Sequence, residues 1–186
     1  SNTYANPYTA AKGRVPYRPD WKSFTEVNLD IPALVAFLKE RGMGLCMYMH
    51  GDVLRGNDMD KLFATYEKWG LAGLKPGFVQ YGTAEQTDWI RKMVATAAAH
   101  RLWLCVHDAY VPEGMERTYP NLMLVEGGGG QEGNHPIQQD VVMPFTRCLA
   151  GPFDYTPFIY AKGKSHAHGA AFFLLFPGPS AVMRGG

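Results

Sequence analysis

The chain has 186 residues, 46% of them hydrophobic, and a formal net charge of +1. This length suffices for one sizeable core and is short for two ordinary domains. Positive and negative residues are scattered along the sequence, so no basic stripe is present and we expect no nucleic-acid partner. No apolar run reaches the roughly 18 to 20 residues that a bilayer requires, so we expect no membrane span in this segment.

Apolar segments of strand length alternate with amphipathic segments of helix length. The first helix is predicted from Pro32 to the stop at Gly42. A strand over 45–49 follows, and then a helix that Asp58 caps and Gly70 ends. The later segments are predicted as strands over 71–79, 102–107, 122–125 and 181–183, and as helices over 83–100, 141–149 and 167–176. Such alternation indicates an α/β fold with a parallel sheet.

The number of strands suggests a barrel. With a further strand over 25–28, the chain offers about six or seven strands, whereas a (β/α)8 barrel of the TIM type has eight strands in roughly 250 residues. We therefore predict a (β/α)8 barrel that is incomplete at both ends. In this interpretation residues 21–186 form the partial barrel, and residues 1–20 are an N-terminal segment without assigned structure.

Polar residues directly follow four of the predicted strands. The active site of such a barrel lies at the C-terminal ends of its strands, so these positions are the first candidates for a functional site. They are residues 50–52, residues 77–81, His107 with Asp108, and Glu126 with Glu132. A solvated loop is the simpler interpretation of any one of them, but their occurrence together favours a site.

Three carboxylates stand out at these strand ends: Asp108, Glu126 and Glu132. Glycosidic cleavage needs a proton donor for the leaving oxygen and a second carboxylate that attacks the sugar or activates water. The same oxygens could instead converge on a hard cation such as Ca2+. The glycine-rich spacer between the two glutamates lets the backbone fold closely around a bound group, or forms a flexible loop.

The three cysteines have no metal-site spacing. Cys46, Cys105 and Cys148 lie far apart in apolar segments, so we interpret them as core thiols. Among the aromatic residues, Tyr81 and Tyr110 fall in predicted strand-end loops, where a sugar could stack on them.

Several sequence blocks, in order and at matching spacing, resemble glycoside hydrolase family 97. They are FTEVN at 24–28, WGLAGLK at 69–75, HDAYVPEGMERTYPNLM at 107–123, EG at 126–127, the glutamate at 132, PFTR at 144–147 and AGPFDYTP at 150–157. The resemblance covers most of the chain from about residue 20. It implies a catalytic barrel between an N-terminal β-sandwich and a C-terminal β domain, both absent from this segment.

The resemblance also implies an activity and a set of functional residues. The family hydrolyses α-glucosidic or α-galactosidic bonds in oligosaccharides with the help of Ca2+. Glu132 matches the general acid, Glu126 matches a calcium-binding glutamate, and Asp108 stands where inverting members carry a glutamate that holds the metal and the attacking water. We therefore expect Glu132 and Asp108 to be catalytic and Asp108, Glu126 and Glu132 to be metal ligands. Substrate contacts are predicted at His107, Tyr110 and Lys75.

One position bears on the stereochemistry. Retaining members carry a nucleophilic aspartate at the end of the strand that here contains Gly77. A glycine cannot form a glycosyl-enzyme ester, so the resemblance favours an inverting mechanism in which water attacks directly. Pro76 beside it is unusual for an interior strand, because proline lacks a ladder donor.

Three hypotheses remain open from the sequence. The leading one is an inverting, Ca2+-dependent α-glycosidase. The alternative is a catalytically inactive, carbohydrate-binding relative, in which Pro76, Gly77 and Asp108 have replaced working residues. A third is a metal-binding scaffold with unrelated chemistry. The segment itself gives no location, and the family resemblance implies a periplasmic or secreted bacterial protein.

Overall fold

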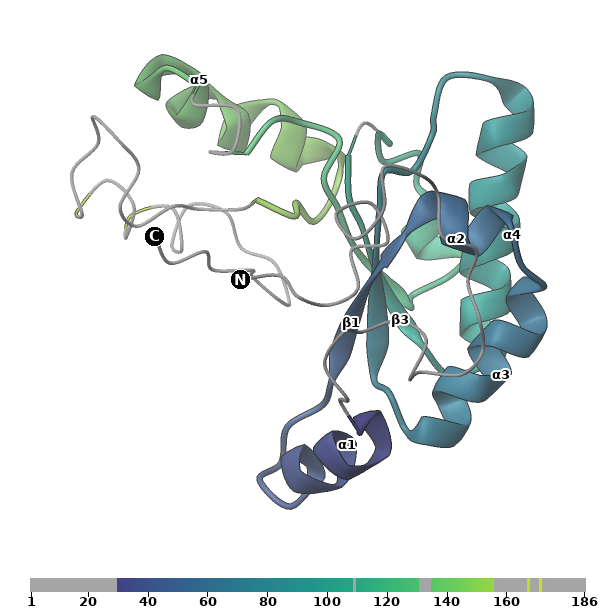
Figure 1. Ribbon diagram of the computed structural model, residues 1–186. Helices are drawn as coiled ribbons and strands as arrows, with labels where there is room; N and C mark the ends of the chain where they lie inside the picture. Colours follow the sequence, from purple (N-terminus) through teal and green to yellow (C-terminus); the bar gives the residue numbers. More distant parts are fainter. Residues whose placement is uncertain (1–29, 109, 131–134, 156–166, 168–170, 172–186) are drawn as a thin grey trace, which may run out of the picture.

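The computed structural model describes residues 30–108, 110–130, 135–155, 167 and 171. Its centre is a four-stranded parallel sheet in the order β1-β2-β3-β4 (Figure 1). The strands are β1 (Cys46–His50), β2 (Gly73–Gly77), β3 (Trp103–Val106) and β4 (Leu122–Val125). Helical segments connect each strand to the next, which confirms the predicted α/β alternation.

Local capping signals define the main helices. These helices are α1 (Ile31–Lys39), α3 (Met59–Trp69) and α4 (Ala84–Ala99). The carboxylates of Asp30 and Asp58 each accept a hydrogen bond from the amide three residues later, at 2.9 and 3.3 Å. Gly70 ends α3 with a φ of +81°, a conformation that glycine adopts without strain. At the start of α4, Thr83 and Gln86 form a reciprocal capping box. The predicted helix boundaries are therefore confirmed to within a few residues.

Helices α3 and α4 lie together on one side of the sheet (Figure 1). Their apolar faces and the sheet residues beneath them form one hydrophobic core. Fully buried members of this core include Phe63, Tyr66, Leu74, Ile90, Met93 and Leu104. This core packs against the sheet, and the polar residues of interest follow the C-terminal ends of its strands.

Strand register explains how Pro76 is accommodated. β1 and β2 pair from Cys46↔Gly73 to His50↔Gly77, but the β2–β3 pairing ends at Leu74↔Leu104. Beyond that point the Pro76 carbonyl accepts a hydrogen bond from the His107 amide at 2.9 Å. The nitrogen of Pro76 faces the same side as its carbonyl, toward β3. The regular β2–β3 pairing therefore ends where proline lacks the donor, while the pairing with Met49 of β1 continues.

Two segments differ from the sequence prediction. A short helix, α2 (Gly51–Arg55), begins directly after β1, where a loop was expected. The single helix predicted over 141–149 is wrong. The chain forms α5 (Ile137–Val142) and then two 3-10 turns, η4 (Met143–Phe145) and η5 (Arg147–Ala150). Pro144 accounts for the break, because it lacks an amide hydrogen and its ring crowds the preceding turn.

The chain returns to the sheet after η5. Phe153 forms an isolated parallel bridge with Val125, so the chain after η5 lies beside β4. The strands predicted over 25–28 and 181–183 lie outside the described residues, as does the helix over 167–176 apart from residues 167 and 171. Among the residues that are described, no helix has the length and apolar character needed to cross a membrane.

Candidate active site at the strand ends

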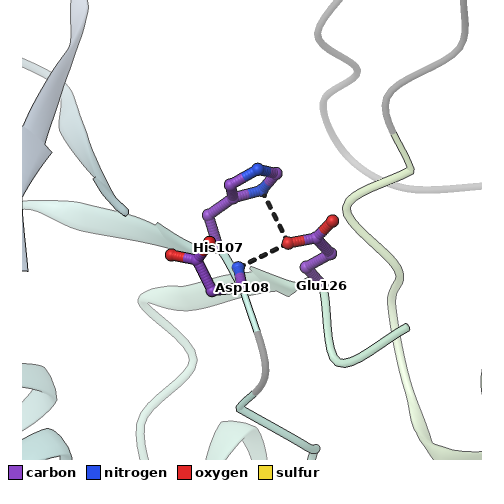
Figure 2. A group of neighbouring side chains, drawn as sticks. All are labelled: His107, Asp108 and Glu126. Carbon is purple, nitrogen blue, oxygen red and sulfur yellow. Dashed lines mark hydrogen bonds and ion pairs between the residues drawn. The ribbon is translucent and has the colours of Figure 1, made fainter. Parts of the chain in front are cut away.

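Three side chains from two neighbouring strand ends meet in space. His107 and Asp108 follow β3, and Glu126 follows β4; one ligand atom of each lies within 4.8 Å of the others (Figure 2). His107 Nδ1 is 3.0 Å from Glu126 Oε2. The Asp108 backbone N–H donates to the same oxygen. The structure thus brings together two of the three carboxylates that the sequence predicted to share a pocket.

Asp108 has an unusual backbone conformation. Its φ is +72°, in the left-handed region that side chains with a Cβ rarely adopt. The Asp108 amide donates a hydrogen bond to the Glu126 carboxylate. The Asp108 Oδ2 accepts a hydrogen bond from the Val79 amide at 3.2 Å. These contacts hold the strained residue between the ends of β2 and β4. Strain of this kind clusters at functional sites, and here it fixes the direction of a carboxylate.

Glu126 is buried among charged groups. Burial raises the pKa of Glu126 to about 7, the His107 ring partly offsets this effect, and the nearby Asp154 and Asp108 carboxylates add to it. The side chain therefore changes charge near neutral pH. A bound cation would favour its ionised form and reverse the direction of this shift.

Asp154, which sequence analysis did not assign to the site, lies beneath this cluster. Its Oδ2 is 2.8 Å from Lys75 Nζ and 3.1 Å from His107 Nδ1, and its side chain is fully buried. Burial acts to raise the pKa of Asp154, but the His107 hydrogen bond and the Lys75 charge outweigh it and lower the pKa to about 2. Lys75, from β2, therefore faces the same site as the residues that follow β3 and β4.

Arg147 holds the Asp154 segment against β4. Its Nε donates to the Glu126 carbonyl at 2.8 Å and its Nη2 to the Val125 carbonyl at 2.5 Å. Its guanidinium also lies over the Phe153 ring, 4.8 Å from the centroid. The Asp154 amide donates to the Val125 carbonyl at 3.0 Å. These contacts explain how a residue 47 positions after His107 reaches the same cluster.

The other predicted site residues have different positions. Glu132 lies outside the described residues. Tyr110 is fully buried in the core, in a T-shaped contact with the Tyr81 ring, and its substrate contact stays a prediction. Lys75 and His107 are nearly buried, with 12% and 13% of their side chains exposed. Sequence analysis did not assign Arg147 or Asp154 to the site. Arg147 lies in the PFTR block and Asp154 in the AGPFDYTP block.

Gly77 leaves space that a neighbouring aromatic side chain fills. A Cβ added at Gly77 would lie against the hydroxyl and ring of Tyr48, from β1. An aspartate at position 77 would therefore need Tyr48 to move. The described structure has no carboxylate at the position where the retaining members of the resembled family carry their nucleophile.

A parallel sheet wound with helices, with acidic side chains gathered at the C-terminal strand ends, is the arrangement found in α/β-barrel enzymes. The family model described as glycoside hydrolase 97 matches residues 17–128. The chain belongs to glycoside hydrolase family 97. The resemblance expected from the sequence is thereby confirmed.

Individual relatives agree with this assignment. A protein described as a probable retaining α-galactosidase, from Streptomyces bingchenggensis, is 33% identical over 141 residues. A retaining α-galactosidase from Bacteroides thetaiotaomicron is 28% identical over 136 residues. The matches cover 75% and 69% of this chain but 22% and 20% of the relatives, so the chain spans about a fifth of their length.

A solved structure supports the fold. A family 97 enzyme from a Pseudoalteromonas species, in complex with panose, superimposes with a TM-score of 0.72 at 25% identity. The superposition covers 89% of this chain and 32% of that enzyme. The predicted fold class is confirmed: the four strands are part of a (β/α)8 barrel.

Proposed function

We propose that this chain carries part of the catalytic centre of an enzyme that hydrolyses α-glycosidic bonds in oligosaccharides. The observation that supports the proposal most is the convergence of His107, Asp108 and Glu126 at adjacent strand ends. Family membership supports glycoside hydrolysis as the chemistry of such a site. The named activity of the two curated relatives makes α-galactosides the first substrates to test, with α-glucosides beside them.

The test is hydrolysis by the complete protein of matched α-galactosides and α-glucosides. Turnover should fall strongly in Asp108→Asn and remain in Asp88→Asn, an exposed α4 residue with 73% of its side chain accessible. Saccharide binding without turnover would favour the alternative of an inactive carbohydrate-binding relative. Neither binding nor turnover would favour the unrelated metal-binding scaffold.

We further propose an inverting mechanism. Gly77 offers no nucleophile, and Tyr48 lies against it in the space that a side chain at that position would enter. The names of the curated relatives point the other way, because both are called retaining. Stereochemistry depends on the group that faces the anomeric carbon, so the absence of a carboxylate at position 77 supports inversion. In this proposal Glu132 donates a proton to the leaving oxygen and Asp108 orients the attacking water.

A Ca2+ ion fits the residues present. Asp108 and Glu126 supply the carboxylate oxygens that calcium prefers, and we propose Glu132 as a further ligand. The Glu126 pKa of about 7 indicates that local positive charge does not fully compensate the buried carboxyl. His107 already has its Nδ1 beside Glu126, and an imidazole nitrogen is a poor calcium ligand. When bound, the ion would supply positive charge that favours ionised carboxylates and orients oxygen groups.

The protein residues have separate tasks in this proposal. Glu126 fixes the Asp108 amide, and the Val79 amide fixes the Asp108 carboxylate. The Asp108 carboxylate is therefore oriented before substrate binds, which reduces the reorganisation that the reaction requires. Lys75 and His107, from neighbouring strands, offer hydrogen-bonding groups to sugar hydroxyls. Calorimetric titration of the complete protein with Ca2+ tests the metal part, and no binding in wild type would contradict it.

A further inference from the structure

The buried Asp154 carboxylate contacts both Lys75 and His107, two predicted substrate-contact residues. A single oxygen, Oδ2, lies 2.8 Å from Lys75 Nζ and 3.1 Å from His107 Nδ1. The Asp154 side chain is fully buried, whereas the other two retain small exposed fractions. Asp154 therefore lies beneath them and has no exposed surface with which to contact a sugar.

The contacts of His107 determine which ring nitrogen carries a proton. Nδ1 lies 3.0 Å from Glu126 Oε2 and 3.1 Å from Asp154 Oδ2. An ionised carboxylate only accepts hydrogen bonds, so Nδ1 must be the donor to the ionised Asp154. A neutral His107 then has its unprotonated nitrogen at Nε2, on the ring edge away from Glu126 (Figure 2). Asp154 and Glu126 therefore favour the same tautomer, and the hydrogen bond to the buried Asp154 oxygen also restrains the plane of the ring.

Lys75 needs a partner for a different reason. Its long side chain has many rotamers, and a buried ammonium without a counter-charge is strongly disfavoured. Asp154 supplies the counter-charge and an acceptor at 2.8 Å. Arg147 and the Phe153 bridge hold the Asp154 backbone in place from the other side. The position of the lysine amine therefore depends on the segment that follows η5.

We propose that Asp154 is a positioning residue that holds Lys75 and His107 in one orientation for binding sugar hydroxyls. This inference rests on the proposed function for its substrate and on the observed contacts for its geometry. Asp154 acts on binding through two other side chains, so its loss should weaken substrate binding more than it slows the bond-breaking step. In kinetic terms, KM should rise while kcat changes little.

The first experiment compares Asp154→Asn with a matched buried control in the complete protein. The control is Asp140→Asn, because Asp140 is also buried and accepts a hydrogen bond from the Tyr155 hydroxyl at 3.0 Å. We expect Asp154→Asn to raise KM about tenfold with kcat within about threefold, the size of one lost charge-assisted hydrogen bond. Asp140→Asn should leave KM within about twofold. Equal KM values for the two variants would overturn the proposal.

A double-mutant cycle separates positioning from a general structural role. If Asp154 acts through Lys75 and His107, then Asp154→Asn should raise KM by a smaller factor in the Lys75→Gln background than in wild type, because one of the two side chains that it holds is already gone. Independent, multiplicative effects would contradict the proposal. The double variant also removes both partners of the buried ion pair. It is therefore expected to fold even if Asp154→Asn alone, which leaves the lysine uncompensated, does not.

Crystal structures of wild type and Asp154→Asn give a readout that does not depend on activity. The proposal predicts that the Lys75 and His107 side chains change orientation or lose defined positions in the variant. Unchanged orientations of both would overturn it. If the complete protein neither binds nor hydrolyses an α-glycoside, the proposed function fails, while this comparison still decides whether Asp154 positions the two residues.

Discussion

The helical layer and the strand ends obey different rules, although they share the same strands. In the helical layer, α3 and α4 begin at capping residues, Gly70 ends α3 in a relaxed conformation, and the side chains beneath are apolar and buried. At the strand ends, Asp108 is strained, Glu126 is buried with a raised pKa, and Asp154 is buried and charged. A protein tolerates such local conflicts where function requires them, so the difference supports the strand ends as the candidate active site.

The largest expected effects concern turnover at the strand ends. Asp108→Asn should lower kcat by about 10²- to 10⁴-fold on substrates with either poor or good leaving groups, because the activated water is lost. Glu132→Gln should lower turnover of poor leaving groups by a similar factor and spare aryl glycosides, which need little protonation. Steady-state kinetics on both substrate types checks the pair. Equal losses on both types in Glu132→Gln would remove that residue as the general acid.

The helical layer should respond in stability instead. Phe63 on α3 is fully buried, and Phe63→Ala should lower the free energy of unfolding by about 3–5 kcal/mol through lost burial and the cavity left behind. Variants that remain folded should keep the wild-type KM. Thermal or denaturant unfolding of the complete protein measures the loss. A loss below about 1 kcal/mol would show that α3 is not part of the core.

The pH dependence of stability should reveal Glu126. Its carboxyl shifts from the ordinary value of 4.5 to about 7 in the folded protein. Between these values the folded state holds a proton that the unfolded chain has released, so metal-free stability should decrease as pH rises from 4.5 to 7 and then level off. Glu126→Gln should remove this slope. Ca2+ at neutral pH should stabilise wild type more than the variant, and identical melting curves for the two would contradict the account.

Asp154 should give the opposite trend at lower pH. Its pKa is lowered from 3.8 to about 2, so its contribution is present above pH 3.8 and is lost as pH falls towards 2. Comparison of acid unfolding in wild type and the Asp154→Asn/Lys75→Gln double variant isolates this contribution. Superimposable curves would show that the buried ion pair carries no net pH-dependent stability.

The smallest predicted effect is local to one helix end. Thr83→Ala removes one half of the capping box at the start of α4 and should cost about 0.5–2 kcal/mol of stability without changing KM. The matched control is Thr96→Ala on the same helix, whose hydroxyl donates to the Lys92 carbonyl but caps no terminus. If both substitutions cost the same, the cap adds nothing beyond ordinary helix propensity.

The same contrast explains what the sequence could and could not predict. Helix ends such as Thr83 and Gly70 depend on residues three or four positions away, so local patterns identify them. Asp108 and Glu126 were predicted as neighbours because parallel strands place their ends together. Arg147 and the bridge to β4 bring Asp154 to the site, and no spacing rule indicates these contacts between distant segments. The family resemblance supplied the roles of these blocks, whereas the carboxylates alone left a cation site open beside a glycosidase.

The most direct test of the central claim is proton NMR of the first sugar that the complete protein releases from an α-galactoside or α-glucoside. The signal reports both whether the bond is hydrolysed and from which face water attacks. Gly77, with Tyr48 packed against it, predicts that the β-anomer appears first and the α-anomer only later by mutarotation. An α-anomer formed first would require a nucleophile elsewhere in the site and would contradict the inverting mechanism, and release of no sugar would contradict the catalytic role itself.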